Sequence, residues 1–187
     1  MSQTKNYAKK WTHPMQKPFV DKVVVNIGVG RAGEELQKAS KVLETMTGQT
    51  PVVIRAKKNV KEWGVRKGQS IATKVTLRGE RAADFIKKSL VVFDNRILRK
   101  AFDKRGNVSW GIDEHIKVPE VKYDPEIGIF GFNVSVKLVR PGFRVKYRKK
   151  LRRKIGEDHY VSRDEAMFFF EKEFNIEIVD KMEARFY

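Results

Sequence analysis

The sequence has no cysteine among its 187 residues. Disulfide bonds, thiolate nucleophiles and cysteine-ligated zinc sites are therefore excluded. Histidine is scarce as well: the three residues lie far apart in the sequence and have no visible set of metal ligands. The acid and histidine cluster Asp113-Glu114-His115 consists of adjacent residues, which seldom converge on one substrate, so we interpret it as surface decoration. No serine-nucleophile elbow or Walker motif is present. We therefore expect no enzyme, no cofactor and no metal site.

Long apolar runs are also missing. No segment approaches the roughly 18 apolar residues that a membrane span needs, and residues 1–10 lack the apolar core of a signal peptide. Internal repeats and low-complexity tracts are absent from the sequence too. We expect a cytoplasmic protein without a membrane partner.

Acidic residues are in short supply. The chain has 40 Lys and Arg against 23 Asp and Glu, a formal net charge of +17. Residues 157–187 hold nine acids and four bases, so 36 bases face 14 acids in the first 156 residues, which carry +22. A chain with this charge repels itself unless an anion neutralises it. A polyanion such as a nucleic acid is the partner that this distribution predicts.

The remaining composition is that of a folded protein. Apolar residues make up 41% of the chain and include twelve Phe and three Trp, enough to offset the entropy of ordering the chain. A length of 187 residues favours one domain over two. We predict a single domain over residues 1–187, with a basic segment at 144–154 and a C-terminal extension at 155–187.

Hydrophobic periodicity predicts the order of the elements. Apolar and polar residues alternate in the strands predicted at residues 21–30, 71–78 and 131–139. Short strands are predicted at residues 51–55, 108–112 and 115–118. Apolar residues recur at three- and four-residue spacing in the predicted helices, which are residues 34–46, 80–98 and a last helix that ends at 174 and starts with a capping box of Ser162 and Glu165. Strands separated by two long helices predict an α+β fold, with both helices on one face of an antiparallel sheet.

The other face of that sheet is predicted to be polar and positive. If Val23, Val25 and Ile27, with their counterparts on neighbouring strands, point at the helices, strict alternation puts the residues between them on the opposite side. These residues are Asn26, Lys74, Thr76, Arg78, Ser135 and Lys137. A solvated sheet face has the same pattern, and the net charge favours a binding face.

Two further segments are strongly basic. The loop at residues 56–70 combines an aromatic that could stack on a base or anchor the loop in the core, Trp63, with five cations: Lys57, Lys58, Lys61, Arg66 and Lys67. Residues 144–154 contain eight cations in eleven positions, with Val145, Tyr147 and Leu151 interleaved. The cations are Arg144, Lys146, Arg148, Lys149, Lys150, Arg152, Arg153 and Lys154. Such density predicts RNA contact more than a solvated tail.

A glycine motif supports a different hypothesis. Gly28, Gly30 and Gly33 match the G-x-G-x-x-G fingerprint of dinucleotide-binding proteins, after a strand and before a helix. The second strand ends in Arg55, where that fold has an acid, and no further βαβ units follow. A nucleotide-dependent oxidoreductase is thus one alternative, and a basic DNA-architectural protein is another.

Several ordered motifs closely resemble ribosomal large-subunit protein five. They are VVVNIGVG at residues 23–30, TGQTP at 47–51, RAKKNVKEWGVRKGQSIATKVTLRGE at 55–80, FDKRGNVSWGI at 102–112 and HIKVPEVKYD at 115–124. LVRPGFRVKYRKK at 138–150 and HYVSRDEAMFFFEKEFNIEI at 159–178 resemble the archaeal and eukaryotic version of the family, which extends past the bacterial C-terminus. The tail after Ile178 has no counterpart that we could match.

The resemblance implies a function in translation. It implies an RRM-like open sheet in the central protuberance of the large ribosomal subunit, whose surface grips 5S rRNA. Matched residue by residue, the polar positions that contact 5S rRNA fall on Asn26, Gln49 and Thr76, while strand parity adds Lys74, Arg78, Ser135 and Lys137. Residues 57–70 match the loop that approaches the P-site tRNA, and residues 103–111 lie in the part that faces small-subunit protein thirteen across an intersubunit bridge. The expected partners are 5S rRNA, 23S-type rRNA, P-site tRNA, small-subunit protein thirteen and neighbouring proteins of the central protuberance.

Overall fold

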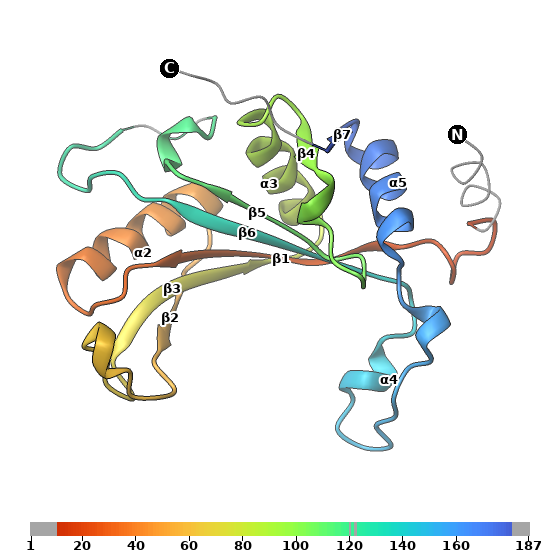
Figure 1. Cartoon of the computed structure of the whole chain (residues 1–187), viewed down its shortest axis with the longest axis horizontal. Helices are drawn as coiled ribbons and strands as arrows, with labels where there is room; N and C mark the ends of the chain where they lie inside the picture. Colours follow the sequence, from red (N-terminus) through yellow and green to blue (C-terminus); the bar gives the residue numbers. More distant parts are fainter. Residues whose placement is uncertain (1–10, 120, 122, 181–187) are drawn as a thin grey trace. The chain divides into compact units, whose positions relative to one another are not determined.

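The computed structural model describes residues 11–119, 121 and 123–180 (Figure 1). The chain divides into two compact units. Unit 1 comprises the described parts of residues 1–22, 93–109 and 136–187, and unit 2 comprises residues 23–92 and the described parts of 110–135. Three of the four boundaries fall inside strands and the fourth falls between α3 and β4, so the chain passes from one unit to the other several times. The prediction of one domain over residues 1–187 stays a prediction.

A five-stranded sheet with the order β2-β3-β1-β6-β5 organises the fold. Its strands are β1 (Phe19–Gly28), β2 (Val52–Arg55), β3 (Ser70–Leu77), β5 (Val108–Ile112) and β6 (Phe132–Val139). In unit 2, β3 pairs antiparallel with β1 and with the edge strand β2. The predicted α+β class and antiparallel sheet are confirmed, and the four main strands agree with the alternating segments to within two residues at each end.

Helices α2 (Glu34–Thr47) and α3 (Glu80–Val91) lie on the same side of the strands of unit 2 (Figure 1). They bury the apolar stripe that their spacing predicted, including Leu43 of α2 and Ile86 of α3. Phe85 of α3 packs edge-on against Phe132, with ring centroids 6.4 Å apart. Helix α2 ends at Gly48, which has φ 62 and lets the chain turn back towards β2. One face of the sheet is therefore covered.

Unit 1 has a core rich in aromatic rings. It contains β4 (Arg96–Leu98), β7 (Glu177–Val179), which pairs parallel with β4, the short α4 (Arg144–Tyr147) and α5 (Arg163–Phe174). Phe170 of α5 is fully buried and packs edge-on against Phe102, with ring centroids 5.7 Å apart. Ser162 caps α5 as predicted, because its hydroxyl accepts a hydrogen bond from the backbone N–H of Glu165.

Two predicted elements are wrong. The helix predicted over residues 80–98 ends at Val91, because Asp94 and Asn95 adopt positive φ values of 51 and 58 that break the helix before β4. The strand predicted at residues 115–118 is a 3-10 turn, His115–Lys117. Turn residues end the helix early in the first case. In the second, the buried His115 bonds to Phe130, fifteen residues away, and its carbonyl accepts the N–H of Val118 in a 3-10 turn.

Candidate nucleic-acid interface

The uncovered face of unit 2 presents a row of side chains across three adjacent strands. Asn26 of β1 pairs with Lys74 of β3, and Lys74 pairs in turn with Val52 of β2. Their neighbours Val25 and Val75 are buried at 0% and 2% exposure, so alternation directs Asn26 and Lys74 to the opposite face. Adjacent strands lie about 4.8 Å apart, so the row offers an amide, an ammonium and an apolar group in line.

A second row lies two pairs further along the same two strands. Thr76 of β3 pairs with Val24 of β1, and both side chains are partly exposed. Ser135 of β6 is exposed between the buried Val134 and Val136, as strand parity predicted. Hydroxyl, amide and ammonium groups therefore share a face that also exposes two valines.

Asn133 is a residue that the sequence reasoning missed. It is exposed on β6 with the same parity as Ser135, and its side-chain oxygen stands 3.1 Å from where a Cβ on Gly111 of β5 would lie. Glycine at position 111 thus leaves room for this amide on the open face. The alternation of Asn133 with Phe132 and Val134 was visible in the sequence and is sufficient to find it.

The remaining predicted 5S-binding residues stand elsewhere. Arg78 is exposed in the turn between β3 and α3, and Gln49 is exposed in the turn after α2. Lys137 belongs to unit 1, where its ammonium donates a hydrogen bond to the Tyr147 hydroxyl and lies 3.8 Å from the Asp21 carboxylate. The charge of Lys137 is therefore partly compensated within the protein.

The basic loop between β2 and β3 is an ordered hairpin. Val60 and Val65 exchange two backbone hydrogen bonds of 2.9 and 3.0 Å, and the Asn59 side chain accepts from the N–H of Lys67 at 2.6 Å. Trp63 ends the 3-10 turn Lys61–Trp63 and is 77% exposed, so it does not anchor the core. The five cations around it are all exposed: Lys57, Lys58, Lys61, Arg66 and Lys67.

Beside this hairpin is an open, mainly apolar groove of about 750 Å³. Its wall includes Trp63, Ile71 and the turn at residues 28–30, which belongs to the G-x-G-x-x-G motif. The N–H groups of Val29 and Gly30 both donate to the Ile71 carbonyl, at 3.0 and 2.8 Å. In a dinucleotide-binding fold these amides would face the pyrophosphate. Their engagement by β3 removes the basis of the oxidoreductase hypothesis.

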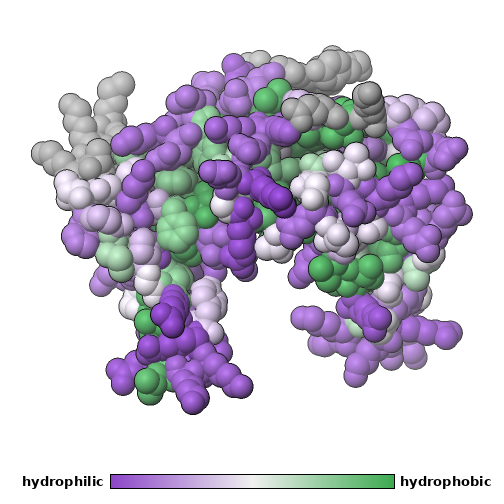
Figure 2. All heavy atoms as spheres, turned by 180° about the vertical axis from the view of Figure 1, so that it is seen from behind, coloured by the Kyte–Doolittle hydropathy of each residue, from purple (hydrophilic) through white to green (hydrophobic). Residues whose placement is uncertain are grey.

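The cations of residues 144–154 stand on an arm of unit 1 that begins with α4 and turns back. The N–H of Arg153 donates to the Val145 carbonyl at 3.2 Å, and the Arg148 side chain donates to the Leu151 carbonyl at 2.8 Å. Lys146 and Arg148 are partly buried, and the other six are exposed: Arg144, Lys149, Lys150, Arg152, Arg153 and Lys154. Figure 2 shows hydrophilic residues over most of this arm, at the lower left of that view.

The predicted surface position of His115 is wrong. His115 is 3% exposed, donates its backbone N–H to the Phe130 carbonyl and accepts the Phe130 N–H at Nδ1. Burial lowers the pKa of His115 below its usual value near 6.5, and a backbone hydrogen bond with Phe130 raises it by less. The ring helps to fix the loop after β5 in place.

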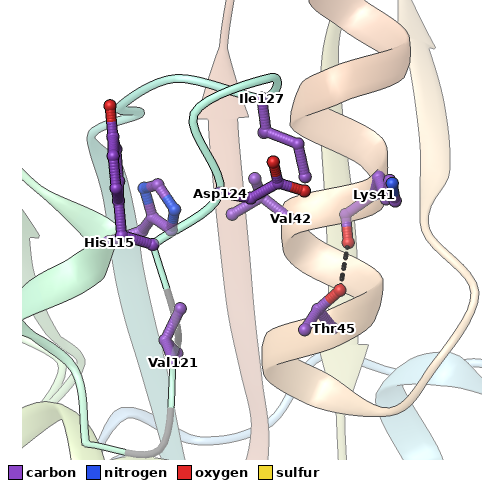
Figure 3. Close-up of a pocket in the computed structure, with 8 residues that line it drawn as sticks. Lys41, Val42, Thr45, His115, Val121, Asp124 and Ile127 are labelled. Carbon is purple, nitrogen blue, oxygen red and sulfur yellow. Dashed lines mark hydrogen bonds between the residues drawn. The ribbon is translucent and has the colours of Figure 1, made fainter.

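A pocket of about 300 Å³ lies between that loop and α2 (Figure 3). Figure 3 shows His115, Asp124 and Ile127 on the loop side, opposite Val42 and Thr45 of α2. The Thr45 hydroxyl donates to the Lys41 carbonyl within the helix, so it is already satisfied. Over the described ranges, no three His, Asp or Glu side chains stand close enough together to hold a metal ion.

In the part of the chain that the structure describes, no helix combines the length and the apolar composition of a membrane span. The open sheet face, the hairpin and the arm share exposed cations.

Comparison with known proteins identifies the relatives of this fold. The profile of the family described as "Ribosomal protein L5" matches residues 13–66, and the profile of the C-terminal part of the same ribosomal family matches residues 70–172. Three curated archaeal relatives carry the name "Large ribosomal subunit protein uL5". The chain is 51% identical to that of Sulfurisphaera tokodaii over 169 residues (90% of this chain and 96% of the relative), 49% to that of Methanosphaera stadtmanae over 164 residues (88% and 98%) and 48% to that of Pyrobaculum aerophilum over 166 residues (89% and 93%).

Proposed function

The chain belongs to the ribosomal protein L5 family, and from that premise we propose that its open sheet face binds 5S rRNA and helps to attach this RNA to the large ribosomal subunit. The protein is a structural component of that subunit and not an enzyme, in line with its archaeal relatives. Its place of action is the ribosome.

The observation that carries the 5S proposal is the row of Asn26, Lys74 and Val52 across three strands. RNA recognition on an open sheet needs donors and acceptors for base edges and the ribose 2′-hydroxyl, a cation for phosphate and apolar surface beneath the bases. The two rows supply all three kinds of group on one face. Asn133 and Ser135 extend the polar surface along β6.

For the hairpin at residues 56–70 we propose contact with the P-site tRNA. A hydrogen-bonded hairpin holds its tip in one conformation, so an exposed Trp63 can meet a partner at low entropic cost. Exposed cations on either side supply attraction to phosphates, and an indole ring can stack on a base. This tRNA contact does not involve the two sheet rows, because the rows consist of residues of β1, β2 and β3 and not of the hairpin.

We place the intersubunit contact with small-subunit protein thirteen near residues 103–111. The Asp103 carboxylate accepts the N–H groups of Arg105 and Asn107 at 2.9 and 2.6 Å, which fixes a tight turn with Lys104 and Arg105 exposed.

The arm at residues 144–154 is proposed to bind 23S-type rRNA through its exposed cations. Other proteins of the central protuberance are expected as neighbours.

The test of 5S binding compares two variants that each remove one ammonium. Lys74→Ala alters the open face, whereas Lys87→Ala alters an exposed cation of α3 on the covered side. A hydrogen bond to a charged group is worth about 1.5 to 3 kcal/mol, and 1.4 kcal/mol is about tenfold in affinity. Filter-binding titration of 5S rRNA with Lys74→Ala should show a loss of affinity of about tenfold or more.

In the same titration Lys87→Ala should stay within about twofold of the parent, because it loses only long-range attraction. Equal losses for both variants would mean that the face is not the binding surface. Competition with duplex DNA at physiological salt addresses the DNA-architectural alternative, which predicts that the duplex displaces 5S rRNA at comparable concentration.

A further inference from the structure

The tip of the arm at residues 144–154 carries an exposed leucine in an unusual conformation. Leu151 is 77% exposed and has φ 52, in the left-handed region. Leucine gains nothing from that region, where its Cβ crowds the following carbonyl oxygen, and glycine or asparagine is the ordinary occupant. An exposed leucine alone needs no explanation, but one held in a strained backbone points to a function.

Two hydrogen bonds within the arm hold the backbone around Leu151. The Arg148 side chain donates to the Leu151 carbonyl at 2.8 Å, and two residues later Arg153 closes the arm onto Val145. At its base, the buried Phe143 packs edge-on against Tyr160, with ring centroids 5.5 Å apart. The apolar tip is therefore carried on a rooted support within unit 1.

The residues around Leu151 indicate which class of partner the tip contacts. Five exposed cations stand within three residues of Leu151: Lys149, Lys150, Arg152, Arg153 and Lys154. They attract phosphates, and phosphates bring bases and riboses with them. Next to an RNA backbone, the apolar surfaces available to a leucine side chain are the faces of unstacked bases. Apolar side chains inserted at a base step are a known device of nucleic-acid binding.

We propose that Leu151 is an apolar wedge that inserts beside an unstacked base of a ribosomal RNA, while the cations around it hold the backbone of the same RNA. The inference rests on the proposed function, since it requires that the chain binds rRNA. It adds a contact that reads RNA conformation, because insertion at a stacked step requires that step to be unstacked, whereas an already unstacked base has no such cost.

The test uses the full chain and three substitutions at one position. Leu151→Met keeps the apolar volume, Leu151→Ala removes it, and Leu151→Lys replaces it with a further cation. If the tip acted through charge alone, Leu151→Lys would bind more tightly and with a steeper dependence on salt. As a wedge, Leu151→Ala and Leu151→Lys should each bind about five- to twentyfold more weakly, and Leu151→Met should match the parent.

The probes are transcribed 5S rRNA and large-subunit rRNA from one of the archaeal relatives, titrated separately, so that the RNA concerned is identified. Chemical probing should show one base whose reactivity changes with the parent and not with Leu151→Ala. Tighter binding by Leu151→Lys, or unchanged binding by Leu151→Ala to both RNAs, overturns the wedge. Loss of subunit incorporation with unchanged affinity for both naked RNAs also overturns it, because the tip then contacts a protein. If the parent chain binds neither RNA, the proposed function itself has failed.

Discussion

At the scale of single residues, burial decided the role of His115. The sequence offered an acid and histidine cluster that resembled surface decoration, and the structure gives a buried ring with a backbone partner at Nδ1. Nothing in Asp113-Glu114-His115 announces this, because the burial comes from α2 and from Phe130, fifteen residues away. A neutral imidazole in such a place is a group that acid must charge at a cost.

The stability of the fold should therefore decrease as the pH falls below about 6.5. Burial lowers the pKa of His115 in the folded state, so below its usual value near 6.5 the unfolded chain binds a proton that the folded chain does not. The free energy of unfolding then declines by up to about 1.4 kcal/mol per pH unit until the folded-state pKa is reached. Thermal unfolding followed from pH 8 to pH 5 measures this decline.

His115→Asn keeps an acceptor near the position of Nδ1 and should flatten the profile over that range. His13→Asn is the matched control, since it makes the same exchange at an exposed histidine. A parent profile that is flat from pH 7 to pH 5 would contradict the burial of a neutral ring.

The contacts of Ser162 and Glu165 show which interactions a local sequence pattern can predict and which it cannot. The Ser162 hydroxyl caps α5 as the spacing predicted, but the Glu165 carboxylate is engaged elsewhere, accepting from Trp11 Nε1 at 3.0 Å and from Arg140 Nη2 at 2.5 Å. Those partners are 154 and 25 residues away in the chain. Capping chemistry is local and could be predicted, whereas a buried ion pair between distant segments could not.

At the scale of elements, alternation located the main strands and the parity of the open face correctly. Periodicity failed at the end of a helix and at a short strand. The helix predicted to residue 98 stops at Val91. The strand that follows it, β4, pairs with β7, 81 positions later in the chain. The pairing of β4 is a tertiary contact, invisible to a window of a dozen residues. For the site, strand parity placed Asn26, Lys74 and Ser135 on one face and left Lys137 with protein partners that the sequence did not reveal.

The hairpin between β2 and β3 should act separately from the sheet face. We expect Trp63→Ala to leave 5S affinity within about twofold of the parent, since the side chain is 77% exposed and supports no core. It should weaken the protection of P-site tRNA in reconstituted subunits by about fivefold or more, because a stacked base is worth about 1 to 3 kcal/mol. Footprinting of the tRNA measures this effect.

Tyr123→Ala provides the comparison, because Tyr123 is an exposed aromatic of the same unit at 56% exposure and lies outside the hairpin. It should change neither readout. A loss of 5S binding with Trp63→Ala would show that hairpin and sheet face are not independent.

At the scale of the whole molecule, charged contacts and uncharged polar contacts should differ in how strongly salt weakens them. With about six to ten phosphates neutralised, affinity for rRNA should fall roughly 10³- to 10⁵-fold between 50 and 200 mM salt. Replacing the six exposed cations of the arm by serine should make the logarithmic salt dependence shallower for the RNA that the arm contacts. Asn26→Ala should lower affinity for 5S rRNA with the salt dependence unchanged, because an amide releases no counterions.

These slopes come from titrations at four or more salt concentrations. A change of slope with Asn26→Ala, or none with the serine variant on either 5S or large-subunit rRNA, would contradict the division between charged and polar groups.

The parallel pairing of β4 with β7 limits the order in which parts of the molecule can fold during synthesis. Residues 177–179 are synthesised after every residue of unit 2, whose described strands and helices lie before residue 136, so the partner of β4 arrives late. Domains generally fold as their chains emerge. A nascent chain therefore contains every residue of the open sheet face of unit 2 before the partner of β4 has been made.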